Sequence, residues 1–285
     1  MRGFQAPRSA LYLPASNARA VEKARGLAAD LVILDLEDAV KPELKAEARA
    51  AATMAAATFG KHVAIRINAA DTEWHEADVL AVAASLVDAI VVPKVELPDA
   101  LAALAARINK PLIPMIESPL GVYNARQIAA TQGVAGVFVG NNDLAIALKV
   151  PLARAGLITA LQLTVLAARA AGVWVLDGVY NALDDAAGFA AECAHGRLMG
   201  FDGKTLIHPN QIAPCNAAFS PSDAELDDAR ALIEAAAEGA QRFRGRMVEA
   251  MHVEAARAML ARGADYSVLM MAEKSIPPEP ASTNA

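Results

Sequence analysis

Short apolar runs with the composition of strands alternate along this chain with alanine-rich stretches that have the composition of helices. The run Leu31–Glu37 is almost continuously apolar, which is typical of a parallel strand covered on both faces. The alternation continues as far as Pro209. We expect eight strands, at Leu11–Pro14, Leu31–Glu37, Val63–Asn68 and Ala89–Val95, within Pro111–Gly121 and Val134–Leu144, and at Val173–Val179 and Lys204–His208.

Capping residues and prolines predict where the intervening helices begin. Ser16 is expected to cap the first helix. Pro98 and the pair Ser118–Pro119 are each placed to open a later helix, since proline suits the first helical turn. The long helical region before the seventh strand is expected to be interrupted near Pro151 and Gly156.

Eight strands alternating with helices suit either a closed barrel or an open, doubly wound sheet. The polar residues favour the barrel, because they follow nearly every strand and the strand ends of a barrel converge on one mouth. In an open sheet most of them would point to separate places. We therefore predict an α/β fold of the (β/α)₈ TIM-barrel type. The residues concerned are Asp35, Glu37, Asp38, Arg66, Asn68, Lys94, Glu117, Asp143, Asp177 and His208.

After Pro209 the pattern predicts helices only. Ser222–Glu225 has the form of a capping box that starts a helix to about Phe243, and a further helix is expected after a break at Gly245. These helices need a surface to cover, either their own barrel or a neighbouring subunit, which favours a homo-oligomer such as a trimer or hexamer. The expected division is a barrel domain over 1–219, a helical extension over 220–275 and a disordered tail over 276–285.

Composition and charge narrow the class of protein. The net charge of −6 and the lack of a basic run argue against a nucleic-acid partner. The 2 cysteines lack metal-site spacing and suit a reducing compartment. The chain starts without the apolar region of a signal peptide, and its most apolar long window, Leu161–Leu176, contains Arg169 and Gly172. We expect a cytoplasmic protein that does not cross a membrane.

Glu117 and Asp143 follow the fifth and sixth apolar runs. If these runs are neighbouring parallel strands, they lie about 4.8 Å apart, and the two carboxylates could share one small cation. Mg²⁺ suits such a site because one or two carboxylates, waters and substrate oxygens complete its octahedron, and Mn²⁺ has overlapping preferences. The alternative is structural, with Glu117 merely preceding a helix and Asp143 acting as an N-cap.

Six motifs on the expected strands together carry a resemblance to a known family. They are Leu34–Val40, Arg66–Asn68, Pro93–Lys94, Ile116–Ser118, Gly140–Leu144 and Gly200–Ile212. Their order and content resemble the citrate lyase β-subunit-like branch of the HpcH/HpaI aldolase superfamily, over the chain from Arg8 to about Arg262. The resemblance implies a Mg²⁺-dependent carbon–carbon lyase that cleaves or forms citryl-CoA-type or malyl-CoA-type thioesters, with acetyl-CoA and oxaloacetate or glyoxylate as the other reactants.

The resemblance also implies roles for individual residues. Glu117 and Asp143 match the metal ligands of the family, with Glu117 also facing the substrate, and Arg66 matches its substrate-binding arginine. Asp35 and Asp38 match acidic residues of the pocket. Retro-aldol cleavage forms an enolate and a 2-oxo acid, which a divalent ion and a guanidinium stabilise electrostatically.

Each of these assignments has a structural alternative. Arg66 could instead form an ion pair with Asp35 or Glu37. Asp35 and Asp38 could orient metal-bound water or simply balance the charges of Arg66 and Lys94.

The remaining polar residues near the expected mouth have weaker claims. Lys94 is expected to balance charge rather than to form a Schiff base, and His208 to belong to a turn. Arg19 and Lys23, one helical turn apart, could bind the phosphates of CoA or form a solvated helix face. The sequence around Gly200 lacks the first glycine of a phosphate-binding loop, because Leu198 occupies that position.

Three positions depart from the pattern of the family. Asn142 precedes Asp143 where many relatives have an acidic residue, and Ala15 stands where many have glycine. Glu249 stands where lyase relatives often place an aspartate over the neighbouring subunit's site, and we expect it to deliver a proton there.

Two further functions compete with a CoA-thioester lyase. One is a metal-dependent aldolase or hydrolase of a small 2-oxo or hydroxy acid without CoA. The other is a weakly catalytic subunit that binds a partner, such as an acyl-carrier protein, in a larger lyase complex.

Overall fold

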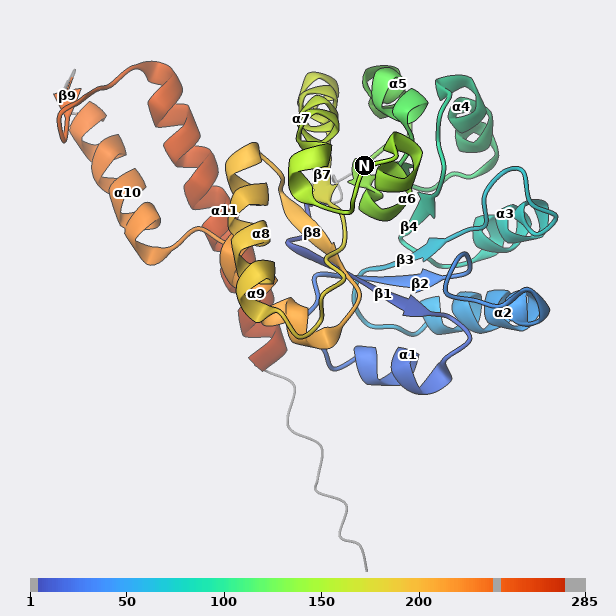
Figure 1. Ribbon diagram of the computed structural model, residues 1–285. Coiled ribbons are helices and arrows are strands. Elements are labelled where there is room, and N and C mark those ends of the chain that lie inside the picture. Colours follow the sequence, from blue (N-terminus) through green and yellow to red (C-terminus); the bar gives the residue numbers. More distant parts are fainter. Residues whose placement is uncertain (1–4, 238–241, 275–285) are drawn as a thin grey trace, which may run out of the picture. The chain divides into compact units, whose positions relative to one another are not determined.

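The computed structural model describes residues 5–237 and 242–274, and the chain forms two compact units, 1–219 and 220–285. In the first unit, eight parallel strands form a closed barrel in sequence order, with β1 paired to both β2 and β8. Figure 1 shows helices packed around the outside of these strands. The strands are β1 (Ser9–Pro14), β2 (Leu31–Asp35), β3 (Val63–Arg66), β4 (Ala89–Val92), β5 (Leu112–Ile116), β6 (Gly136–Val139), β7 (Trp174–Asp177) and β8 (Gly203–Leu206).

This architecture confirms the predicted TIM barrel. The strands are shorter than expected at their carboxyl ends, because residues such as Glu37 and Asn68 already belong to the loops that follow. The helices of the first unit are α1 (Ala18–Ala24), α2 (Lys45–Ala56), α3 (His75–Ala84), α4 (Pro98–Arg107), α5 (Pro119–Ala129), α6 (Asn141–Leu148), α7 (Arg154–Ala171), α8 (Ala186–Met199) and α9 (Ile212–Phe219), with 3-10 turns η1 (Pro42–Leu44) and η2 (Pro209–Gln211).

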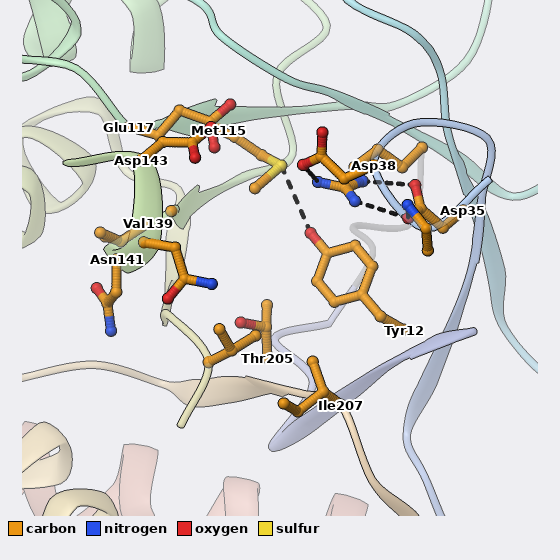
Figure 2. Close-up of a pocket in the computed structure, with 15 residues that line it drawn as sticks. Tyr12, Asp35, Asp38, Met115, Glu117, Val139, Asn141, Asp143, Thr205 and Ile207 are labelled. Atoms are coloured by element: carbon orange, nitrogen blue, oxygen red, sulfur yellow. Dashed lines mark hydrogen bonds and ion pairs between the residues drawn. The ribbon is translucent and has the colours of Figure 1, made fainter. Parts of the chain in front are cut away.

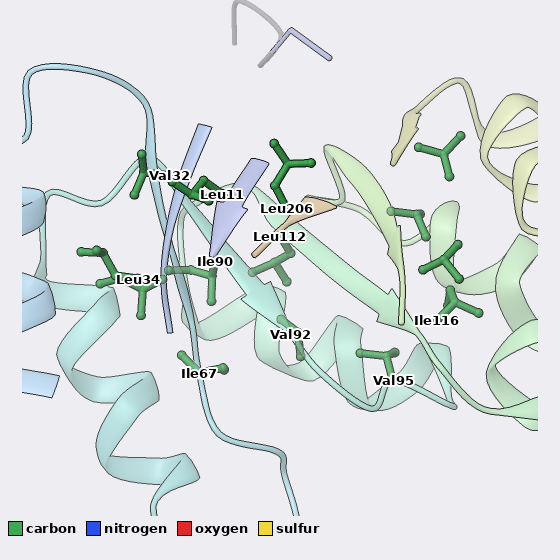
Figure 3. Packing of buried hydrophobic residues seen from close by; sticks show 14 of the residues in the cluster. Leu11, Val32, Leu34, Ile67, Ile90, Val92, Val95, Leu112, Ile116 and Leu206 are labelled. Carbon is green, nitrogen blue, oxygen red and sulfur yellow. The ribbon is translucent and has the colours of Figure 1, made fainter. Parts of the chain in front are cut away.

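Alternate residues of each strand build two separate apolar layers. Leu31 and Ile33 belong to a cluster inside the barrel, whereas Val32 and Leu34 pack in the layer beneath the helices (Figure 3). Asp35 continues the inward-facing series of β2 beyond Ile33. The same alternation therefore directs side chains at the strand ends into the mouth of the barrel.

Local signals decide where the helices begin and end. Pro98 opens α4 and Ser118 caps α5, as predicted, but the side chain that caps α1 is Asn17 rather than Ser16. The predicted interruption is confirmed near Pro151, which lies between the end of α6, where Lys149 is left-handed, and the start of α7. It does not reach Gly156, since this glycine lies inside α7.

In the second unit, α10 (Asp223–Ala237) and α11 (Ala250–Lys274) pack on each other. The predicted capping box is confirmed, because Ser222 Oγ accepts from the Glu225 backbone N–H and the Glu225 carboxylate accepts from Ser222. The prediction of helices only is wrong, since β9 (Arg242–Phe243) and β10 (Arg246–Met247) form a hairpin that turns at Gly245, φ 80°. The predicted tail at 276–285 lies outside the described residues.

Helix length and composition also bear on membrane insertion. Over the parts of the chain that the structure describes, none of the helices combines the length and the apolar character needed to cross a bilayer.

Candidate active site

A cavity of about 300 Å³ opens at the carboxyl ends of the barrel strands (Figure 2). It contains the predicted residues Asp35, Asp38, Arg66, Glu117 and Asp143, which lie at the ends of β2, β3 and β5, in the loop after β2, and in α6. The barrel therefore brings together the polar positions that the sequence distributes over more than 100 residues. The remaining lining residues are Tyr12, Ala39, Met115, Val139, Gly140, Asn141, Asn142, Val179, Thr205 and Ile207.

Glu117 follows β5 directly and is 5% exposed. Its Oε1 accepts a hydrogen bond of 2.5 Å from the backbone N–H of Lys94, and its Oε2 lies against Gly140, where a Cβ atom would stand 2.3 Å from it. Only glycine at position 140 therefore leaves room for this carboxylate. Burial is the main cause that raises the pKa of Glu117 to about 7, and the negative charges of Glu37 and Asp143 add to the rise.

Asp143 lies in the first turn of α6 rather than at the end of a strand. The alternative N-cap role is wrong, because Gly140 occupies the N-cap position and no side chain caps this helix. Asp143 is partly exposed, and its carboxylate lies beside that of Glu117 at the cavity wall (Figure 2). The pair offers oxygen ligands on one side and open cavity on the other.

This donor set fits a magnesium ion rather than a fully protein-bound metal. Within residues 5–237 and 242–274, no cluster of three or more histidine, cysteine, aspartate or glutamate side chains could hold a metal. Mg²⁺ is usually bound through one or two carboxylates, while waters and substrate oxygens supply the remaining ligands. Glu117 and Asp143 satisfy that requirement.

Arg66 is held in a dense ion-pair network at the edge of the cavity. Its Nε and Nη2 donate to the two oxygens of Asp35 at 2.6 and 2.7 Å, and its Nη1 lies 2.8 Å from Glu37 Oε2. The structural alternative for Arg66, an ion pair with Asp35 or Glu37, is thus realised. The guanidinium nevertheless lines the cavity.

The two aspartates of the β2 loop have different surroundings. Asp35 is 1% exposed, and besides Arg66 it accepts hydrogen bonds from the backbone N–H groups of Glu37 and Ala39. The Asp38 side chain is 62% exposed, and its Oδ2 lies 3.6 Å from Arg66 Nη1. Asp35 is a buried support, while Asp38 is accessible from the cavity.

Lys94 has the charge-balancing contact that was expected. Its Nζ lies 3.2 Å from Glu37 Oε1, so Glu37 is held between two cations, Lys94 and Arg66. Burial still raises the pKa of Glu37 above its ordinary value, and the two cations oppose that rise. Lys94 also has a left-handed backbone, φ 53°, which directs its N–H toward Glu117.

Other predicted residues lie away from the cavity lining. Arg19 and Lys23 are exposed on α1, and Glu249 is exposed immediately before α11 in the second unit. Their proposed contacts with CoA and with a neighbouring site stay predictions. His208 belongs to a turn, as expected, because its Nδ1 accepts from the Asn210 backbone N–H.

Sequence reasoning missed Tyr12, Asn141 and Thr205, all of which line the cavity. Tyr12 could have been found from the strand alternation, because Ala10 lies inside the barrel and residue 12 shares its face. The buried Asn141 packs its side-chain amide against Gly178, a tertiary contact that no local pattern indicates.

Comparison with protein families extends the resemblance drawn from the motifs and confirms it. The model of the HpcH/HpaI aldolase/citrate lyase family matches residues 8–209, and a model described as a C–C bond lyase of the TIM-barrel fold matches residues 155–268.

Individual proteins match over most of the chain. A (3S)-malyl-CoA thioesterase of Cereibacter sphaeroides is 47% identical over 90% of this chain and 94% of its own length, and the citrate lyase subunit beta of Escherichia coli is 33% identical over 90% and 92%. Among solved structures, the CitE protein of Mycobacterium tuberculosis in complex with magnesium, acetoacetate and coenzyme A has 30% identity and a TM-score of 0.80, covering 91% of this chain and 98% of that one.

Proposed function

Because the chain belongs to the HpcH/HpaI aldolase/citrate lyase family, we propose that it is a magnesium-dependent carbon–carbon lyase of a β-hydroxyacyl-CoA thioester of the malyl-CoA or citryl-CoA type. Its products are acetyl-CoA and a 2-oxo acid, glyoxylate or oxaloacetate, and the condensation is the reverse reaction. The observation that carries the proposal is the carboxylate pair of Glu117 and Asp143 beside Arg66 in one cavity. Mn²⁺ would satisfy similar oxygen ligands.

Glu117 and Asp143 would hold the metal ion from one wall of the cavity. When bound, Mg²⁺ supplies Lewis-acid polarisation of the substrate oxygens and fixes their orientation. The carboxylate of Glu117 is kept in place by the Lys94 N–H and by its close packing on Gly140. The CitE protein of Mycobacterium tuberculosis, which is similar in structure, is in complex with magnesium and acetoacetate, and this supports a magnesium-dependent reaction here.

Arg66 would bind a carboxylate or developing oxyanion of the substrate. A guanidinium has five N–H donors, and hydrogen bonds to Asp35 occupy two of them, one on Nε and one on Nη2. Nη1 is ion-paired with Glu37, and the Nη donors that Asp35 does not use are the ones that would bind substrate. We assign Asp35 to positioning Arg66, and the accessible Asp38 to moving a proton or orienting water.

The test is turnover of malyl-CoA by the full chain with and without Mg²⁺. Glu117→Gln and Asp143→Asn should each abolish turnover in a protein that stays folded by circular dichroism, and a chelator should abolish the turnover of the wild type until Mg²⁺ is restored. Asp71→Asn, an exposed carboxylate outside the cavity, is the matched control. Full turnover by either site variant under chelation contradicts the proposal.

A second candidate reaction is hydrolysis of the thioester, which the 47% identity to a (3S)-malyl-CoA thioesterase favours. Water would then add to the thioester carbonyl and the CoA thiol would leave, while the carbon–carbon bond stays intact. The products separate the two reactions, because cleavage yields acetyl-CoA with glyoxylate and hydrolysis yields free thiol with malate. The primary proposal is wrong if thiol and malate are the products.

Free malate and oxaloacetate test the remaining alternatives. An enzyme without a need for CoA would turn over the free acids at the rate of the thioester, and Arg19 and Lys23 would then have no phosphates to bind. Double substitution of Arg19 and Lys23 by alanine should raise KM for the thioester. A weakly catalytic subunit would require a partner chain for any turnover.

We further propose a homo-oligomer in which Glu249 delivers a proton to the site of a neighbouring subunit. The exposure of Glu249 in a unit separate from the barrel supports this arrangement. Mixing the inactive Glu117→Gln and Glu249→Gln variants would then restore part of the activity, since some sites would have both residues intact. No recovery from subunits known to exchange would contradict it.

A further inference from the structure

Tyr12 faces the interior of the barrel from β1. It packs with the inner apolar cluster and lines the floor of the cavity, and the guanidinium carbon of Arg66 lies 4.9 Å from the centre of its ring. A guanidinium over an aromatic ring attracts it, which favours this position of the phenol. Tyr12 is therefore a polar group in the cavity that has no role in the proposed mechanism.

The hydroxyl of Tyr12 donates its hydrogen bond to a weak acceptor. Among the residues that the structure describes, its one hydrogen bond goes to the thioether sulfur of Met115, at 3.5 Å (Figure 2). A thioether is a weak acceptor, so this bond is easily exchanged for one to an oxygen. Burial raises the pKa of Tyr12 above its ordinary value, so the phenol stays protonated at neutral pH and can donate.

The strand geometry relates this hydroxyl to the proposed metal site. Met115 and Glu117 face the same side of the chain two residues apart, a spacing of about 7 Å along an extended strand. The Tyr12 hydroxyl, bonded to Met115, and the Glu117 carboxylate therefore face the same cavity. A 2-oxo acid held at the carboxylate pair would lie in the cavity that this hydroxyl faces.

We propose that Tyr12 binds substrate, its hydroxyl donating a hydrogen bond to a carboxylate oxygen of the 2-oxo acid portion. The inference rests on the proposed function and deepens it, because it names a residue that recognises the acid. A hydrogen bond to a charged oxygen is stronger than the resting bond to sulfur, so substrate would displace Met115 as the acceptor. No covalent bond of Tyr12 changes.

The test is calorimetric titration of oxaloacetate into the full chain at saturating Mg²⁺. Tyr12→Phe keeps the ring against Arg66 and removes only the hydroxyl, and it should weaken the Kd for oxaloacetate by about 10- to 100-fold. The Kd for Mg²⁺ alone and the melting temperature should stay unchanged, which a purely structural role would not predict. With malyl-CoA, KM should rise while kcat is largely kept, since the bond forms before the reaction as well as during it.

Tyr123→Phe is the matched control, because this tyrosine is 83% exposed on α5. Its Kd for oxaloacetate should equal that of the wild type. If wild type and Tyr12→Phe bind within about twofold of each other, the inference is overturned and the proposed function stands. If the wild type with Mg²⁺ binds neither oxaloacetate nor glyoxylate, both fail.

Discussion

Asp35 and Arg66 are register partners on β2 and β3, and both carboxylate oxygens accept from the guanidinium, at 2.6 and 2.7 Å. The ion pair is almost completely buried, with side-chain exposures of 1% and 10%. A bidentate pair of this kind fixes the plane of the guanidinium as well as its position. The orientation of Arg66 in the cavity thus follows from the pairing of two strands.

Removing one partner of this pair should cost stability. Asp35→Ala leaves Arg66 without its bidentate acceptor in a buried site, which we expect to lower the free energy of unfolding by about 3–5 kcal/mol. The midpoint of urea unfolding, followed by circular dichroism, measures the change. Asp71→Ala, at an exposed carboxylate, should stay within about 0.5 kcal/mol of the wild type. Equal stabilities would mean that the pair is not formed in solution.

A methyl group at position 140 should damage the proposed metal site directly. The Cβ of Gly140→Ala would stand 2.3 Å from Oε2 and 2.6 Å from Cβ of Glu117, so the carboxylate must move. We expect Mg²⁺ affinity to fall by at least about tenfold, since changing a residue that supports a metal ligand typically costs about 10- to 100-fold. Gly26→Ala is the control, since the nearest atom to its new Cβ would be 3.9 Å away. Unchanged affinity in Gly140→Ala would remove Glu117 from the ligand set.

Magnesium binding should depend on pH through Glu117, whose pKa burial raises to about 7. A proton and Mg²⁺ compete for this carboxylate, so affinity should rise by about tenfold per pH unit well below the pKa and level off about one unit above it. Calorimetric titrations from acid to neutral pH measure the slope. Asp143→Asn should shift the midpoint downward, because it removes one of the charges that raise the pKa. A flat profile in the wild type would contradict the assignment.

Raising the pH, which strengthens Mg²⁺ binding through Glu117, should lower the stability of the metal-free protein through the same carboxyl group. The folded state retains the proton up to a pKa of about 7, whereas the unfolded state retains it only to the ordinary 4.5. The stabilising contribution of the protonated group is therefore complete below 4.5 and is lost as pH rises through 7. Glu117→Gln should abolish this part of the pH dependence of the melting temperature, and saturating Mg²⁺ should mask it. Identical pH profiles for the wild type and Glu117→Gln would rule out this linkage.

The buried ion pairs of Lys204 should affect the free energy of unfolding without changing substrate binding in the cavity. Lys204 is completely buried, and its Nζ lies 3.1 Å from Asp177 Oδ2 and 2.6 Å from Glu192 Oε1. Burial alone would lower the pKa of Lys204, but these two carboxylates raise it above its ordinary value, so the lysine is charged. Lys204→Met should lower the free energy of unfolding by about 3–5 kcal/mol while the folded fraction keeps its Kd for oxaloacetate.

Lys41→Met, at an exposed lysine, is the matched control for Lys204→Met and should be close to neutral. A loss of oxaloacetate affinity in folded Lys204→Met would show that the network also supports the cavity. A stability equal to that of the control would mean that the buried charges contribute nothing.

Much of the site could be predicted because, in a barrel of parallel strands, a residue at the carboxyl end of any strand lies at the same mouth. Glu117 and Arg66 come at the ends of apolar runs, and parallel strands in sequence order direct such ends to one mouth. Asp143 was expected at a strand end but lies in the first turn of α6, because β6 ends at Val139 and its helix starts two residues later. The short loop still leaves its carboxylate beside Glu117.

What could not be predicted depends on contacts between distant segments. The backbone of Lys94 adopts a positive φ to meet Glu117, and nothing in the local sequence indicates this for a lysine. The role of Gly140 likewise depends on the side chain of a neighbouring strand rather than on a turn. The sequence predicts only a break between helices at Gly245 and not the hairpin, because strands of two residues are too short to give a periodic signal.

The left-handed backbone at Lys94 has a consequence for how this position can vary among related chains. The group that contacts Glu117 there is a backbone N–H, which every amino acid except proline has. Asparagine and glycine adopt a positive φ at a lower energetic cost than lysine. Position 94 thus imposes two separable demands, one on the shape of the main chain and one on the ammonium that meets Glu37. Homologues are free to give up the second while they keep the first.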